Sequence, residues 1–207
     1  MARDDERLSR SQQPILVGSL PDAPGILTAI RLTPGLGIHL RGLADELLVH
    51  DFPGTTLERA EREMLATAVS AANDCFYCMD SHGAFATALL EQDGATDRIA
   101  LIDTIKLGSS EGVGPKMAAL LHIARTVRRD ALDLSDDDVA AAHSAGATDA
   151  DVQLAVLIAA AFSMYNRMVD GFRARTPAAA EAYRERAAQI ADNGYSAPAV
   201  TSVPGRS

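Results

Sequence analysis

The sequence predicts an all-α fold, and three observations favour that class. The chain of 207 residues has no Trp and only 4% aromatic residues, so aliphatic residues supply most of its 47% hydrophobic content. Ala and Leu are strong helix formers, whereas a β-sandwich needs aromatic and β-branched residues. Apolar residues also recur at helical spacing along most of the chain, and no convincing strand pattern occurs. We therefore expect packed helices.

The N-terminal residues 1–37 are expected to form an irregular arm. Proline and glycine interrupt this stretch repeatedly, and one short helix fits near residues 25–32. Residues 38–50 have apolar side chains at helical spacing and predict the first long helix. Thr56 is placed as the N-cap of the next helix, which runs to residue 72. Glu63 lies toward its start, where negative charge suits the helix dipole.

The pair Asn73-Asp74 interrupts the helical pattern. Asp74 is a good N-cap residue, so a new helix is expected to follow it and to end near Gly94. Residues 97–107 predict another helix, and Pro115 suits the first turn of one that runs to residue 129.

Two capping-box patterns mark the starts of later helices. Ser135 with Asp138 predicts a short helix to residue 143, and Thr148 with Asp151 opens a long one. This long helix is apolar nearly all round, so we expect it to be central and buried. Pro177 starts the last predicted helix, which runs to about residue 191.

The sequence is thus divided into an arm (1–37), a helical domain (38–192) and a loose C-terminal tail (193–207). Within the domain, residues 68–73 (AVSAAN) resemble residues 161–166 (AFSMYN). A bundle built from two duplicated helical hairpins would explain this internal similarity.

Charge and hydropathy restrict the functional class. The net charge is −9 and the isoelectric point is about 4.9, which disfavours binding to nucleic acid or to anionic membranes. The first ten residues have mixed charge and no apolar stretch, unlike a secretory signal. The longest apolar run, 154–164, is shorter than the roughly 20 residues of a bilayer span. We expect a cytoplasmic protein without nucleic-acid or membrane partners.

The cysteines point to the chemistry. Cys75 and Cys78 are the two cysteines of the chain. A lone CxxC pair in a reducing compartment indicates redox chemistry or a metal site. A structural zinc site needs four ligands, and only His82 is near the pair in sequence. We therefore expect a redox pair, no metal, and no cofactor, because no GxGxxG follows a strand.

Three features favour a reactive thiolate at this pair. Both cysteines are expected near the start of a helix, where backbone N–H groups and the dipole stabilise an anion. His82 is four residues after Cys78, so it lies on the same helical face and can accept its proton. Cys75 shares that face and can close a disulfide on an oxidised Cys78. Glu63 reaches His82 only if the break at Asn73-Asp74 folds its helix back.

These residues form the pattern ERE-x11-CxYC-x3-H, which resembles the alkylhydroperoxidase D and carboxymuconolactone decarboxylase superfamily, and most closely its peroxidase-related branch. The later segment FSMYNRMVDGF resembles the second conserved helix of that branch, and the resemblance spans about residues 36–185. It implies an all-helical fold in a homotrimer or hexamer. It also implies that Cys78 attacks peroxide, that Cys75 resolves, and that Glu63 and His82 relay protons.

One residue departs from the family pattern. Well-characterised alkylhydroperoxidase D members have a second histidine where this chain has Tyr77. A phenol titrates near about 10 and is a poor base at neutral pH. The resemblance nevertheless implies a thiol-dependent peroxidase that takes a hydroperoxide and is reset by an external dithiol. The alternatives are a carboxymuconolactone decarboxylase-type enzyme acting on a small lactone or carbonyl compound, and a redox-sensing oligomer without turnover.

Overall fold

The computed structural model describes residues 14–16 and 18–196, and this part of the chain is helical with one isolated bridge, Pro24 to Arg175, and no strand. The predicted all-α class is confirmed. In chain order the helices are α2 Leu27–Ile30, α3 Pro34–Leu48, α4 Arg59–Ala72, α5 Phe76–Gln92, η1 Thr96–Arg98, α6 Ala100–Lys106, α7 Pro115–Arg129, η2 Ala131–Asp133, α8 Asp136–Ser144, α9 Asp149–Gly171 and α10 Glu181–Asn193.

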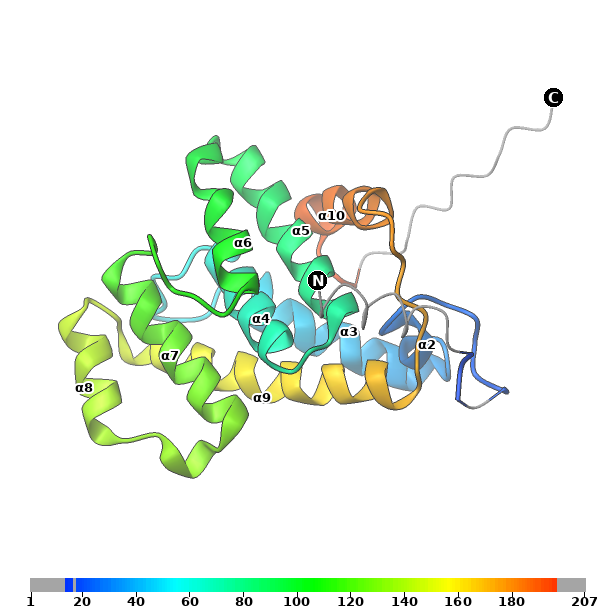
Figure 1. Cartoon of the computed structure of the whole chain (residues 1–207), viewed down its shortest axis with the longest axis horizontal. Helices are drawn as coiled ribbons and strands as arrows, with labels where there is room; N and C mark the ends of the chain where they lie inside the picture. The colour runs from blue at the N-terminus through cyan, green and yellow to red at the C-terminus, as the bar shows by residue number, and fades with distance from the viewer. Residues whose placement is uncertain (1–13, 17, 197–207) are drawn as a thin grey trace.

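Helix α4 lies between the hairpin partner α5 and the long helix α9 (Figure 1). Helices α6 and α10 pack on α5, whereas α7 packs on α9 and α4. The apolar faces of these helices form one large core that includes Leu65, Leu120, Ile158 and Phe162. The α4–α5 pair is therefore held from both sides.

Several helix starts differ from the sequence prediction. Helix α3 begins at Pro34 rather than residue 38, because Thr33 caps it by accepting a hydrogen bond from Leu36 N at 3.2 Å. Helix α4 is capped by Glu58 rather than Thr56. Helix α10 begins at Glu181, not at Pro177. The short helix expected near residues 25–32 is present as α2, and residues 1–13 of the predicted arm lie outside the described residues.

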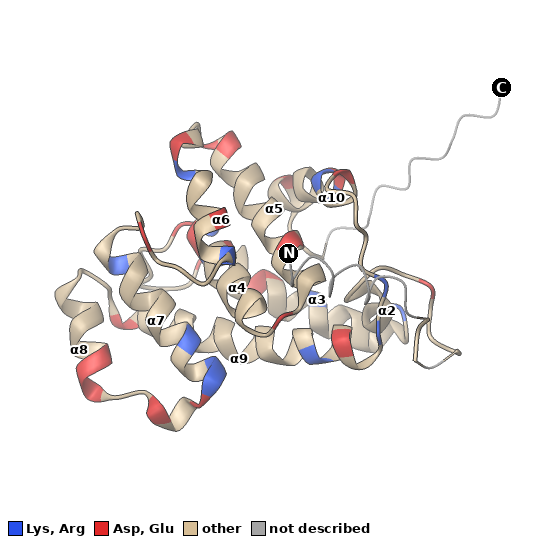
Figure 2. Cartoon of the chain, in the orientation of Figure 1, with Lys and Arg blue, Asp and Glu red and all other residues tan. Residues whose placement is uncertain are grey.

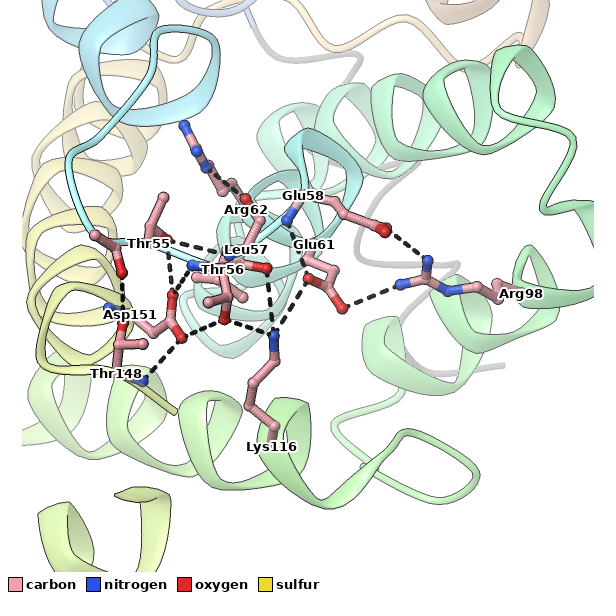
Figure 3. A network of polar contacts seen from close by, with 11 residues as sticks. Thr55, Thr56, Leu57, Glu58, Glu61, Arg62, Arg98, Lys116, Thr148 and Asp151 are labelled. Carbon is pink, nitrogen blue, oxygen red and sulfur yellow. Dashed lines mark hydrogen bonds and ion pairs between the residues drawn. The ribbon is translucent and has the colours of Figure 1, made fainter. Parts of the chain in front are cut away.

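Thr56 is unavailable as a cap because it binds the start of α9. Its hydroxyl and amide donate to Asp151 at 2.7 Å each, and Thr55 Oγ1 donates to the same carboxylate (Figure 3). Burial alone would raise the pKa of Asp151, but bonds from Thr148, Thr55 and Thr56 outweigh it and lower the pKa to about 2. Lys116 Nζ extends the network to Thr56 Oγ1. The starts of α4 and α9 are thereby joined.

The turn between α4 and α5 is a Schellman motif. The Cys75 N–H donates to Ser70 O at 3.0 Å, and the Asp74 N–H donates to Ala71 O at 3.1 Å. Asp74 has φ +55°, so it is the left-handed residue that ends α4. The prediction that Asp74 caps α5 is wrong: Cys75 is the N-cap.

Both predicted capping boxes, Ser135/Asp138 and Thr148/Asp151, are confirmed. The expected central position of α9 is only half correct, since Leu157 and Met164 are exposed on one side. Figure 2 shows that the middle of α9 has no charged residues. Helix α9 is long and apolar enough to cross a membrane by length and composition, but a partly buried core helix meets the same test.

Candidate active site

The hairpin places Glu63 of α4 against His82 of α5. Glu63 Oε2 lies 2.7 Å from His82 Nδ1, across a separation of 19 residues. The Glu63 side chain is fully buried and that of His82 is nearly so. A carboxylate is an acceptor, so the Nδ1–H of His82 donates and Nε2 is left as the proton acceptor of the neutral ring. The predicted fold-back at Asn73-Asp74 is thus confirmed.

Aromatic rings hold the imidazole in place. Its centroid lies 4.5 Å from that of Phe162 and 5.2 Å from that of Phe85, both in edge-on geometry. Phe162 comes from α9 and Phe85 from α5. Because the ring is fixed on its sides and through Nδ1, Nε2 has a defined direction.

Tyr195 completes the buried cluster. Its hydroxyl donates to Glu63 Oε1 at 2.6 Å and lies 3.3 Å from His82 Nδ1. Burial and the nearby Glu63 charge raise its pKa, so it remains a protonated donor. Asp45 of α3 holds this segment by accepting the N–H groups of Tyr195 at 2.6 Å and Ser196 at 2.9 Å.

Tyr195 contradicts part of a sequence prediction. The segment 193–207 was expected to be a loose tail, but Tyr195 is buried in the core and bonded to the site. The remaining residues, 197–207, lie outside the described part. Sequence reasoning gave no signal for this residue, except that one tyrosine occurs in an otherwise small and polar segment.

The two cysteines differ in their surroundings. Both are free and buried, but Cys78 lines the cavity beside His82 and Cys75 does not. Cys78 is the third residue of α5, so it lies in the first turn as predicted. Cys75 has no exposed surface, because the Schellman turn folds it under α5.

Hydrogen bonding also separates the two thiols. A side-chain hydrogen bond to Cys78, reinforced by burial, raises the pKa of the Cys75 thiol well above its usual value. Cys75 therefore remains a protonated thiol that donates to Cys78.

The cavity is small, about 40 Å³, and mostly apolar. That is room for a few atoms, since a single water needs about 10–15 Å³ by the same measure. Cys78, His82 and Tyr195 share its wall with apolar residues of α2, α3 and α9 and with two arginines. Cys78 and His82 thus face one partly open cavity in which a small reactant can meet both.

Tyr77 packs within the wall of this cavity. Burial raises its pKa, so it does not act as a base at neutral pH. Its ring lies 5.9 Å from that of Tyr183 and directly against Gly25, where a Cβ would come within 2.0 Å of Tyr77 Cδ1. Tyr77 therefore shapes the cavity and links the N-terminal segment to α5.

Asn166 of α9 bonds to the end of α4 rather than to the cysteine helix. It accepts from Asn73 Nδ2 at 2.8 Å and donates to Ser70 Oγ at 3.1 Å, both at the end of α4. Arg128 donates to Asn73 Oδ1 at 2.7 Å and to Ala72 O. These contacts fix the turn that carries Cys75.

Among the described residues, no group of three or more His, Cys, Asp or Glu could hold a metal ion.

Comparisons with known proteins identify a family that part of the chain resembles. Residues 43–126 match the carboxymuconolactone decarboxylase family. This stretch contains Glu63, both cysteines and His82. Among curated proteins, no relative matches the chain.

Two solved structures share the fold. A peroxidase-related protein from Silicibacter sp. TM1040 has a TM-score of 0.66 at 22% identity, covering 84% of this chain and 95% of its own. A peroxidase-related protein from Ralstonia eutropha JMP134, described as an alkylhydroperoxidase AhpD core, has a TM-score of 0.66 at 23% identity, covering 86% and 96%. Residues 43–126 are therefore similar to the carboxymuconolactone decarboxylase family, and the chain shares its fold with the two peroxidase-related proteins, in line with the resemblance that the motif indicated.

Proposed function

We propose that the protein is a thiol-dependent peroxidase that reduces organic hydroperoxides with Cys78 as the attacking thiol. The observation that carries the proposal is the hydrogen bond between Glu63 and His82 at 2.7 Å, on the wall of the cavity that Cys78 also lines. A buried carboxylate that orients a histidine next to a thiol is the arrangement that activates a nucleophile.

In the first step, His82 Nε2 accepts the Cys78 proton and the thiolate attacks the terminal oxygen of the hydroperoxide. The S–O bond forms as the O–O bond breaks. The alkoxide takes the proton from His82 and leaves as an alcohol, and Cys78 is oxidised to a sulfenic acid. Glu63 stabilises the imidazolium that forms between the two transfers.

In the second step, Cys75 resolves the sulfenic acid. Its sulfur attacks that of Cys78, the S–S bond forms as the S–O bond breaks, and the leaving hydroxide takes the proton of the Cys75 thiol to become water. Cys75 is suited to this role because it contacts Cys78 yet lies away from the cavity. An external dithiol then reduces the disulfide by thiol–disulfide exchange and is itself oxidised.

We extend the proposal to a homo-oligomer, a trimer or hexamer, that acts in the cytoplasm. The support within the molecule is an apolar strip on α9, containing Leu157 and Met164, that no described segment covers. Light scattering is expected to give a particle larger than the 21.8 kDa monomer. A monomer at micromolar concentration would contradict this part.

The test is catalytic consumption of an alkyl hydroperoxide with a small dithiol as reductant. We expect many turnovers per chain, and loss of turnover in Cys78→Ser. Consumption of one equivalent without turnover would favour the redox sensor. Conversion of a small lactone that survives Cys78→Ser would favour the decarboxylase-type enzyme.

A further inference from the structure

Two arginines line the cavity, Arg41 of α3 and Arg186 of α10. Both are half-buried. Neither has a hydrogen bond or ion pair to another residue in the described part of the chain. A guanidinium carries five donors, and partly removing it from water without a partner is unfavourable.

The other half-buried or buried arginines behave differently. Within the described residues, each of them donates to a carbonyl, a carboxylate or a polar side chain; these are Arg59, Arg62, Arg98, Arg125 and Arg128. The arginines that only support the fold therefore all have hydrogen-bond acceptors. Arg41 and Arg186 are the exceptions, and both are at the cavity that contains Cys78.

The positive charge of this pair is not neutralised by the cavity itself. No carboxylate is among the described residues that line it. The two buried acids bonded to the Tyr195 segment already have partners, since Glu63 accepts from His82 and Tyr195, and Asp45 accepts two backbone N–H groups. A positive site in a chain of net charge −9 is a local feature rather than a property of the whole surface.

The cavity also limits what the anion can be. Apart from the two guanidinium groups, its polar lining consists of hydroxyl groups, His82 and Cys78, and most of its surface is apolar. A planar carboxylate on a short apolar body matches this combination, because guanidinium groups pair with carboxylates through parallel N–H bonds. A larger, more highly charged phosphate monoester would place more charge against apolar walls.

We propose, building on the peroxidase function, that the substrate is a hydroperoxide bearing a carboxylate, and that Arg41 and Arg186 bind this carboxylate while the peroxide group meets Cys78. The arginines are then specificity residues rather than part of the proton relay. Carboxylate substrates are drawn into a cavity that neutral hydroperoxides enter only by apolar contact.

A pair of alkylating reagents tests the proposal without requiring peroxidase turnover. Iodoacetate and iodoacetamide attack the same thiolate with the same leaving group, and they differ in the negative charge of the carboxylate. The ratio of their rates at Cys78, assigned by mass spectrometry, is compared with the ratio for the unfolded chain. We expect the folded protein to favour iodoacetate by about tenfold relative to the unfolded chain.

Variants of the two arginines test whether these residues cause the preference for iodoacetate. Arg186→Gln and Arg41→Gln are each expected to lower the ratio several-fold, and the double variant is expected to bring it to the unfolded value. Arg184→Gln is the matched control, because Arg184 is an exposed residue of the same helix that pairs with Glu181. It removes the same net charge and should leave the ratio unchanged.

A second measurement, the shift of the thermal midpoint on ligand binding, does not depend on labelling the buried thiol, which is slow to react. Propionate is expected to raise the thermal midpoint in wild type and not in Arg186→Gln, whereas propionamide should have no effect in either. Inorganic phosphate tests whether other anions bind, and its effect should be weaker than that of propionate. A folded-protein ratio at or below the unfolded value, or equal effects of propionate and propionamide, would overturn the carboxylate proposal. Neither result would alter the peroxidase assay, so the two proposals fail independently.

Discussion

The end of α4 and the middle of α9 carry similar six-residue segments but continue differently. Residues 68–73 end in Asn73, and the chain then turns through Asp74 at φ +55°. Residues 161–166 end in Asn166, and α9 continues to Gly171. The two asparagines bond to each other at 2.8 Å, so the equivalent positions meet in space.

The difference shows what creates the site. Where the helix stops, α5 reverses beside α4 and brings Cys78 and His82 to Glu63. Where the helix continues, it supplies a wall, with Phe162 against the imidazole. Arg128 binds only the segment that turns, at Asn73 and the carbonyl of Ala72. The chemistry therefore depends on a helix end that this arginine and the Schellman bonds secure.

The largest predicted effect is loss of the relay that the turn assembles. His82→Ala is expected to slow oxidation of Cys78 by about 10²–10⁴-fold, because a positioned general base contributes roughly that much. Glu63→Gln should act in the same direction but more weakly, since it works through His82. Stopped-flow measurement of sulfenic acid formation near pH 7 checks both. Equal rates in wild type and His82→Ala would show that the hairpin does not supply the base.

The second largest effect is expected on stability, through the hydrogen-bond network of Asp151 that joins the starts of α4 and α9. Asp151→Asn is expected to lower the free energy of unfolding by about 2–3 kcal/mol, because a carboxylate whose pKa falls from 3.8 to about 2 favours the folded state by that amount. In wild type this stabilisation is complete above about pH 4 and disappears as the pH falls through 2. Urea titrations from pH 7 to pH 2 should show the variant losing less stability than wild type. Parallel pH profiles would contradict the assignment.

A smaller effect is predicted for the tyrosine that caps the relay. Tyr195→Phe removes one donor from the buried Glu63 and should cost about 1–3 kcal/mol in stability. We also expect the pH at which Cys78 oxidation is half-maximal to shift, because Glu63 and His82 lose a shared partner. The pH profile separates a positioning role from a structural one. Tyr183→Phe, outside the relay, is the control, and an unchanged profile in Tyr195→Phe would count against the role.

The smallest effect concerns the turn itself. Asp74→Gly should stabilise the protein by up to about 1 kcal/mol, since glycine adopts positive φ without steric cost, and Asp74→Ala should destabilise it by about 1 kcal/mol. Arg167→Gly, in the continuing segment of α9, is the matched comparison and should destabilise by about 1 kcal/mol. Thermal melts measure all three. A destabilising Asp74→Gly would show that the carboxylate, not the turn geometry, is what matters there.

The sequence predicted the parts of this site that rest on local spacing. Cys75, Cys78 and His82 lie on one helix, so helical periodicity relates them. Glu63 was within reach only through the break at Asn73-Asp74, and the inferred break is real although Asp74 plays a different part in it. Small polar residues such as Asp occur both at the left-handed end of one helix and at the N-cap of the next. The residue type of Asp74 therefore does not show which of the two roles it has.

Tyr195, Arg41 and Arg186 could not be predicted because long-range packing alone brings them to the site. Tyr195 is 132 residues from Glu63 in the chain. It belongs to a segment whose composition is typical of a tail. The arginines stand out only when the partners of every other half-buried arginine are known.

We infer that the α4–α5 turn makes Cys78, not Cys75, the sulfur that attacks the peroxide. The direct measurement is to expose Cys75→Ser and Cys78→Ser to one equivalent of an alkyl hydroperoxide, to trap sulfenic acid with dimedone, and to locate the adduct by mass spectrometry. We expect an adduct at Cys78 in Cys75→Ser, and at least a hundredfold slower reaction of Cys75 in Cys78→Ser, given the range of about 10²–10⁴ for a positioned base. Rapid trapping at Cys75 with an inert Cys78 would contradict it.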